Sequence, residues 1–101
     1  MIMPQITISD ILQPPAELRL RFLEEWDAAV AYSKRLRNGV VLNRTAFLIL
    51  SLCDGVRTVG EICGWIFENA APTLLSQETV TSDVFEIMNQ MQQWGLLEHM
   101  E

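Results

Sequence analysis

The sequence predicts an α+β domain of winged-helix-like type, in which a three-stranded antiparallel sheet is followed by three helices. Three observations lead to this prediction. Residues 18–42 contain alternating and β-branched runs, and residues 44–94 contain three apolar stripes at helical spacing. The chain has 101 residues, half of them hydrophobic, which is enough for one core without disulfides or metals.

Residues 1–16 are expected to form an N-terminal arm ahead of the domain at 17–101. The arm contains three of the four prolines, and the Pro14-Pro15 pair disfavours regular structure at that point. Within the arm we expect a short strand at Gln5–Ser9.

The strand prediction rests on residues 17–42. The segment 18–22 alternates between apolar and basic residues, which is the period of a half-buried strand. Apolar residues also recur every four positions over 18–30, as on a helix, so local pattern leaves both structures open. The Asn38-Gly39 pair is a strong hairpin signal and precedes the β-branched run at 40–42. We therefore favour three strands, near 18–24, 28–34 and 39–42.

The helices have clear beginnings and ends. Asn43 is suited to cap a helix at about 44–53, and Gly55 supplies the turn that ends it. Thr58-Val59-Gly60-Glu61 has the pattern of a capping box at the start of a helix at about 59–69. Ser76 can cap a third helix at about 77–94, which Gly95 terminates. The apolar stripe of this third helix consists of Val80, Val84, Ile87, Met88 and Met91.

Charge is distributed unevenly along the chain. The net charge is −6, yet every Lys and Arg lies at or before Arg57, and the remainder carries only acidic charges. Such a second half is poorly suited to bind nucleic acid. The chain lacks a run of about 18 apolar residues that would span a membrane, and it lacks a secretory signal, so a cytoplasmic location is expected.

Nothing in the sequence predicts catalysis, a metal site or a cofactor. Cys53 and Cys63 have no zinc-ligand spacing, and they are expected to be buried thiols. His99 is the single histidine and lies near the end of the sequence, a poor position for a preorganised base.

Two segments resemble the PqqD-like family of peptide chaperones, also called RiPP recognition elements. One segment is 42–62, which includes Leu42-Asn43-Arg44-Thr45-Ala46 and Cys53-Asp54-Gly55-Val56-Arg57-Thr58-Val59-Gly60-Glu61-Ile62. The other is the tail, with Asp83-Val84, Ile87-Met88, Met91 and Gly95-Leu96-Leu97. Order and spacing match over about 26–98, and the first segment is the more specific.

The resemblance implies a non-catalytic adaptor. Family members bind the leader segment of a ribosomally made precursor peptide and present it to a modifying enzyme, often a radical-SAM protein. The leader adds a strand to the third strand of the sheet and rests against the third helix, here 39–42 and 77–94. The resemblance also favours strands over a helix for 17–38. The turn at 33–39 departs from the Pro-Glu-Gly turn of members that serve quinone assembly, which favours another modified-peptide pathway.

An exposed edge strand supplies backbone affinity, and side chains beside it supply specificity. The expected peptide-binding residues are Val40, Val41 and Leu42 of the strand, Asp83, Val84, Ile87, Met88 and Met91 of the helix, and Lys34, Arg35 and Arg37 of the preceding turn. Two alternatives stay open at this point. The helix stripe also fits an ordinary core, and the three cations either attract acidic leader residues or simply discourage edge aggregation.

Two other functions compete with the adaptor. A winged-helix DNA-binding regulator would use the same architecture, but its recognition helix would be 77–94, which contains three acidic residues and no Lys or Arg. An assembly module would pair the exposed edge with a second copy, so the chain is either a monomer or a homodimer.

Overall fold

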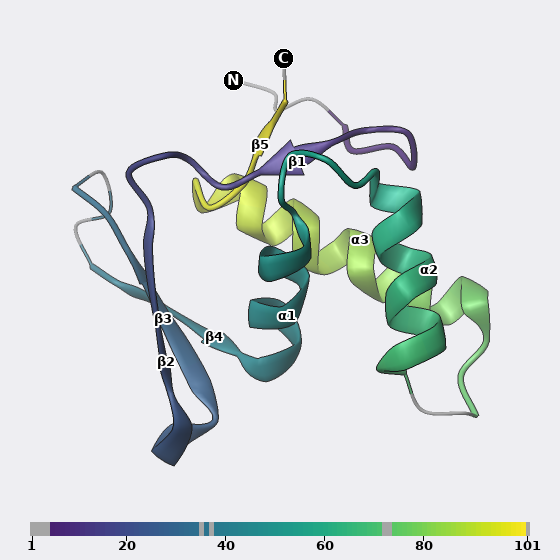
Figure 1. The fold of residues 1–101 in the computed structure, drawn as a ribbon, viewed down its shortest axis with the longest axis horizontal. Coiled ribbons are helices and arrows are strands. Elements are labelled where there is room, and N and C mark those ends of the chain that lie inside the picture. The colour runs from purple at the N-terminus through teal and green to yellow at the C-terminus, as the bar shows by residue number, and fades with distance from the viewer. Residues whose placement is uncertain (1–4, 35, 37, 72–73, 101) are drawn as a thin grey trace.

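In the computed structural model, the chain forms a three-stranded antiparallel sheet, three helices and a two-stranded ribbon that joins the two ends of the chain (Figure 1). The structure describes residues 5–34, 36, 38–71 and 74–100. The elements are β1 (Leu12–Gln13), β2 (Arg19–Leu23), the short 3-10 helix η1 (Glu24–Trp26), β3 (Ala28–Tyr32), β4 (Val40–Asn43), α1 (Arg44–Leu52), α2 (Val59–Asn69), α3 (Gln77–Gln93) and β5 (Glu98–His99). The predicted α+β order of three strands and then three helices is confirmed.

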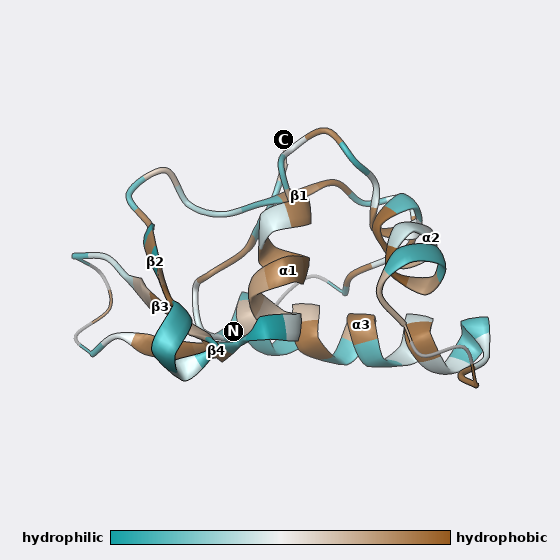
Figure 2. Cartoon of the chain, turned by 60° about the horizontal axis from the view of Figure 1, so that its bottom comes forward, coloured by the Kyte–Doolittle hydropathy of each residue, from teal (hydrophilic) through white to brown (hydrophobic). Residues whose placement is uncertain are grey.

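The sheet has the strand order β2-β3-β4 and lies to one side of the helices (Figures 1 and 2). Its inner face carries Ala29, Ala31 and Leu42, which are buried. The small alanines let α1 approach the sheet closely, and the rings of Phe22 and Phe47 lie 5.2 Å apart across this contact. On the other side of α1 lie α2 and α3, so α1 stands at the centre of the fold.

The helix ends follow the predicted capping chemistry. The amide of Ala46 donates to Oδ1 of Asn43 at 2.8 Å, which caps α1. Thr58 and Glu61 form both hydrogen bonds of the capping box at the start of α2, at 3.0 and 3.1 Å. Gly55 and Gly95 both adopt positive φ, near 79° and 78°, where glycine is favoured. These local signals explain why the three helices begin and end as predicted.

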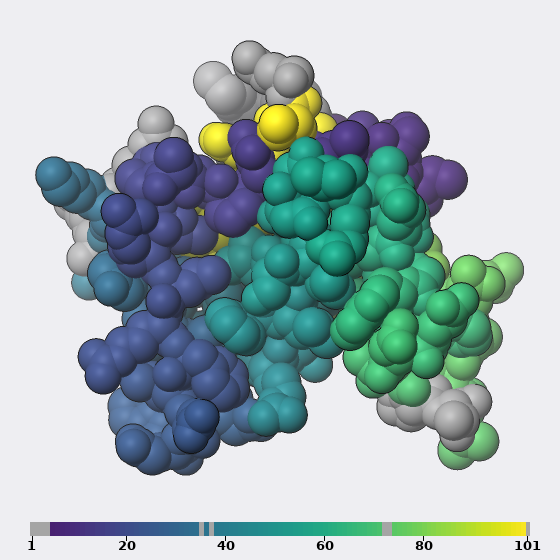
Figure 3. Space-filling view, viewed as in Figure 1, coloured from purple at the N-terminus to yellow at the C-terminus, as the bar shows by residue number. Residues whose placement is uncertain are grey.

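The N-terminal arm packs against the rest of the fold (Figure 3). Ile6 and Leu12 are buried in the same core as the helices. The carbonyl of Ile8 accepts from the amide of Gly60 at 2.8 Å, and β1 pairs with β5 in antiparallel register. The expected strand at Gln5–Ser9 is wrong, because this stretch bonds to the start of α2 through isolated contacts rather than a ladder. The strand in the arm is β1 instead.

The strands β3 and β4 are farther apart in the sequence than the Asn38-Gly39 turn signal predicts. β3 ends at Tyr32 and β4 begins at Val40, so the connection spans 33–39 rather than a two-residue turn. Gly39 has no positive φ of the kind that a type I′ turn requires. Within the described residues, no helix is long and apolar enough to cross a membrane.

Candidate functional site

The free edge of β4 is the first feature of the candidate site. Val41 pairs with Val30 and Leu42 pairs with Ala29, so β3 occupies one side of the strand. Across the described part of the chain, no strand pairs with the other side. Backbone N–H and C=O groups along such an edge are available to another extended chain. The side chain of Val41 is 64% exposed at this edge.

A groove runs between this edge and α3. It has a volume of about 130 Å³, and residues from β4, the first turn of α1 and the second half of α3 line it. The lining residues are Val41, Leu42, Asn43, Ala46, Ile87, Gln90, Met91 and Trp94. Leu42 and Met91 are buried, whereas Trp94 is 46% exposed. The groove therefore combines an unpaired backbone with apolar side chains and the polar side chains of Asn43 and Gln90, an arrangement suited to strand addition.

The structure brings together four of the predicted binding residues. Val41 and Leu42 of β4 and Ile87 and Met91 of α3 all line the groove. Val40 lies on the same strand and is half-buried, although it does not line the groove. Residues of the predicted strand and of the predicted helix therefore lie on opposite walls of one groove.

The other predicted residues lie elsewhere. Met88 has no exposed surface and lines neither the groove nor the neighbouring pocket, because it faces the core on α3. Val84 is buried and Asp83 is exposed, and both belong to a second cavity described below. Lys34 is exposed in the loop before β4. Arg35 and Arg37 lie outside the described residues.

Several lining residues were missed by the sequence analysis. Gln90 and Trp94 follow Ile87 at i+3 and i+7 on α3, so they lie on the same face of the helix. Gln90 is polar, so it falls outside an apolar stripe, and Trp94 lies at the end of the helix, beyond the last residue of that stripe. Asn43 was interpreted only as the cap of the first helix, and Ala46 was not assigned to the site, although both line the groove where β4 leads into α1.

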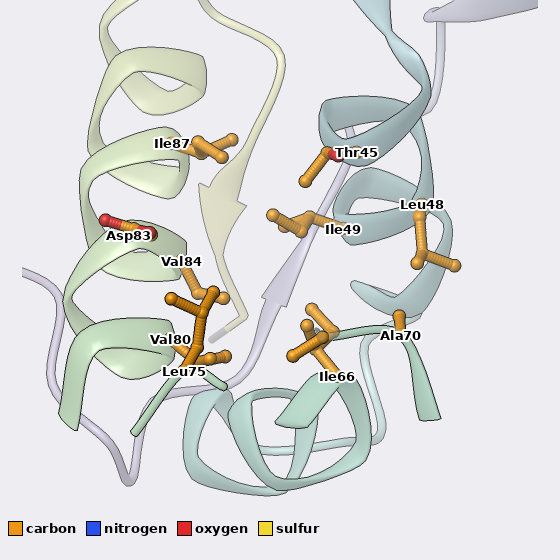
Figure 4. A pocket seen from close by; sticks show the side chains of 11 residues that line it. Thr45, Leu48, Ile49, Ile66, Ala70, Leu75, Val80, Asp83, Val84 and Ile87 are labelled. Carbon is orange, nitrogen blue, oxygen red and sulfur yellow. The ribbon is translucent and has the colours of Figure 1, made fainter. Parts of the chain in front are cut away.

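A second cavity lies beside the groove, between the three helices (Figure 4). Its volume is about 230 Å³, and its lining is apolar apart from Thr45 and Asp83. Leu48 and Ile49 come from α1, Ile66 from α2, and Val80, Val84 and Ile87 from α3, with Ala70, Ala71 and Leu75 from the α2–α3 connection. Ile87 lines both this cavity and the groove, so the two are adjacent.

Two features away from the groove involve ionisable groups: the buried thiol of Cys53 and the cluster that His99 forms with Asp10. Burial raises the pKa of the Cys53 thiol to about 12, so it is protonated and unreactive at neutral pH. Nε2 of His99 lies 3.0 Å from Oδ2 of Asp10, and Nδ1 of His99 lies 3.3 Å from the side-chain nitrogen Nε2 of Gln92. This cluster ties the arm and β5 to the end of α3. Within the described chain, no group of three His, Cys, Asp or Glu side chains could hold a metal ion.

Comparisons with known proteins bear on the family and the fold of the chain. The family model described as coenzyme PQQ synthesis protein D (PqqD) matches residues 29–97. The solution NMR structure of the PqqD truncation of Methylobacterium extorquens PqqCD, described as a functional and stand-alone RiPP recognition element, superposes with a TM-score of 0.73 at 24% identity. The match covers 92% of this chain and 94% of that chain. No curated protein matches this sequence.

Proposed function

Since the chain belongs to the PqqD family, we propose that it is a peptide-recognition adaptor whose ligand, a leader segment of a precursor peptide, adds a strand to β4 in the groove against α3. In this proposal the adaptor performs no chemistry and presents the peptide to a modifying enzyme. The observation that carries the proposal is the open edge of β4 with an apolar groove directly beside it.

The energetics favour an apolar peptide with at least two anchors. Backbone pairing along β4 is indifferent to sequence, so the groove side chains must supply selectivity. Burial of one Leu or Ile of the peptide contributes about 1.5–3 kcal/mol. Ordering a short disordered segment costs about 2–5 kcal/mol, which two such anchors offset. Met91 on the groove wall is unbranched and polarisable, so it adapts to different aliphatic guests.

A DNA-binding function is not supported by the charges on α3. Glu78, Asp83 and Glu86 are exposed on this helix, and it has no Lys or Arg. Phosphate groups would be repelled from this helix, which would be the recognition helix of a winged-helix regulator.

The test is a display selection of random 20-residue peptides against the wild-type chain, with Ala46→Phe as the matched control. Ala46 lines the groove, so the added ring fills it. We expect peptides that bind the wild type and lose at least tenfold in affinity for the variant. With a selected peptide, NMR should show contacts between its amides and β4.

Thermal unfolding first establishes that Ala46→Phe is folded, and Gln90→Trp serves in its place if it is not, because Gln90 is exposed on the groove wall. The proposal is wrong if no peptide is enriched, or if the enriched peptides bind both proteins equally and contact another surface.

A further inference from the structure

The pocket between the three helices is large enough for an aromatic side chain. An engineered protein cavity of about 150 Å³ lined by Leu, Ile and Phe accepts benzene. The three-helix pocket has about 230 Å³ and a lining of similar character, with Ile49, Ile66 and Val84 around it (Figure 4). The groove beside β4, at about 130 Å³, suits aliphatic side chains better than a ring.

The pocket lies on the path that a peptide in the groove would follow. Thr45 lines the pocket and Ala46, the next residue of α1, lines the groove. On α3, Ile87 belongs to both. A chain paired with β4 therefore reaches the pocket as it passes the Asn43 end of the strand. The sheet is antiparallel throughout, and antiparallel pairing is the commoner and slightly more stable form. In that orientation, the residues that reach the pocket precede the paired segment.

The charge around the pocket is negative. Asp83 is the single charged residue of the lining, and its side chain forms no ion pair with any residue that the structure describes. Glu78 and Glu86 are exposed on the same helix, and no Lys or Arg follows Arg57 in the sequence. A cation beside the aromatic ring would find a partner here, whereas an acidic residue would be repelled.

We propose that the three-helix pocket binds an aromatic side chain of the leader peptide, located just before its β4-paired segment and next to a Lys or Arg that meets Asp83. The inference rests on the proposed function, because the groove places the peptide at the pocket. It adds a recognition rule for the guest: an aromatic residue with an adjacent cation, followed by an aliphatic strand.

A probe that needs no leader peptide tests the pocket directly. Phenethylamine carries a ring and a cation, and phenylacetate carries the same ring with an anion. Each is titrated into the ¹⁵N-labelled full chain. We expect amide shifts at Thr45, Leu48, Ala70 and Ile87, with the amine binding roughly two- to fivefold more tightly than the acid, as expected for one exposed ion pair. Asp83→Asn should remove this preference and leave the binding of the ring.

Two substitutions on α1 provide matched controls. Thr45→Phe should fill the pocket and abolish the shifts for both probes. Ser51→Phe adds the same ring to an exposed position of α1 that lines neither cavity, so it should leave the titrations unchanged. If Thr45→Phe does not fold, Ala70→Phe replaces it. The inference is overturned if the probes shift other residues, shift none, or bind with no charge preference.

The displayed peptides separate this inference from the proposed function. Peptides that bind the groove but lack an aromatic–cation pair ahead of the paired segment contradict the inference and leave the adaptor function standing. Phenethylamine binding at the pocket in the absence of any enriched peptide contradicts the adaptor function instead.

Discussion

The sheet has two free edges within the described chain, and they differ in what lies beside them. The edge at β4 adjoins α3 and α1, which form an apolar groove with it. The edge at β2 carries exposed Arg19 and Arg21 and packs mainly on β3. Both edges present backbone groups, but the groove between the sheet and α3 lies beside the β4 edge. An open edge offers backbone hydrogen bonds to any extended chain. The side chains of the neighbouring helix are what make the β4 edge a candidate peptide-binding site.

The largest effect is expected from a charge placed in the groove. Ile87→Glu puts a carboxylate where apolar side chains of the guest would be buried, and we expect peptide affinity to fall by roughly 10- to 100-fold. Leu20→Glu changes an apolar residue of β2 that is 37% exposed, and it should alter affinity less than twofold. Calorimetry with a selected peptide measures both. An equal loss in the two variants would mean that the edges do not differ.

Proline substitutions examine the backbone of each edge. Amides along an edge strand point alternately inward and outward, so one of Val40 and Val41 donates away from β3. Proline at that position should leave the domain folded and reduce peptide affinity roughly two- to tenfold, the contribution of one hydrogen bond. As a control, proline is placed at Leu20 or at Arg21 of β2. The variant of these two that folds should bind the peptide with unchanged affinity.

Circular dichroism identifies the folded member of each pair before binding is measured. Unchanged affinity in both β4 variants, once folding is established, would contradict backbone pairing at that edge.

The charge of the loop before β4 should affect the association rate of the peptide more than its affinity. Lys34 is exposed there, and Lys34→Glu should slow association with an acidic peptide about twofold in low salt, with less effect on dissociation. Arg21→Glu makes the same change in charge at the other edge and should have a smaller effect. Stopped-flow fluorescence at two salt concentrations measures the association rates of both variants. A larger effect from Arg21→Glu would mean that the charges of β2, rather than Lys34, attract the peptide.

Acidification should remove a small part of the stability that Asp10 contributes to the fold. A hydrogen bond from the backbone amide of Thr7 holds the pKa of Asp10 below its usual value of 3.8, and His99 adds to this effect. A carboxyl group with a lowered pKa stabilises the fold above that usual value, and this stabilisation disappears as the pH falls through the lower folded-state pKa. Asp10→Asn should therefore lower the Tm slightly at pH 6, and the difference should disappear as the pH falls through the lowered pKa of Asp10.

Thermal scans of both proteins across this range provide the measurement. A difference in Tm that persists unchanged at the lowest pH would show that Asp10 acts through packing rather than through its charge.

The helices could be predicted more completely than the site. Caps and glycines at Asn43, Thr58, Ser76 and Gly95 act within a few residues, so local spacing was enough to find the helix ends. The ribbon of β1 and β5 was not predicted, because two-residue strands at opposite ends of the chain leave no local pattern. The connection at 33–39 is longer than the Asn38-Gly39 signal predicts, because β3 ends at Tyr32 rather than near residue 34.

Ile87 and Met88 show why the site required the structure. They are neighbours in one apolar stripe, and the sequence offered both as peptide contacts. The structure places Met88 fully in the core and Ile87 at the junction of groove and pocket. Adjacent helix residues differ in direction by about 100°, so the elements that pack around α3 decide which of them is covered.

The sequence alone determined the fold class, the bounds of three helices and the family, because capping, periodicity and motif spacing are local properties. Only the tertiary structure decided that β4 remains open on one side, that a groove and a pocket meet at Ile87, and that the arm joins the core. Those features depend on contacts between residues far apart in the chain, where burial of apolar surface selects one arrangement among many that the local pattern permits.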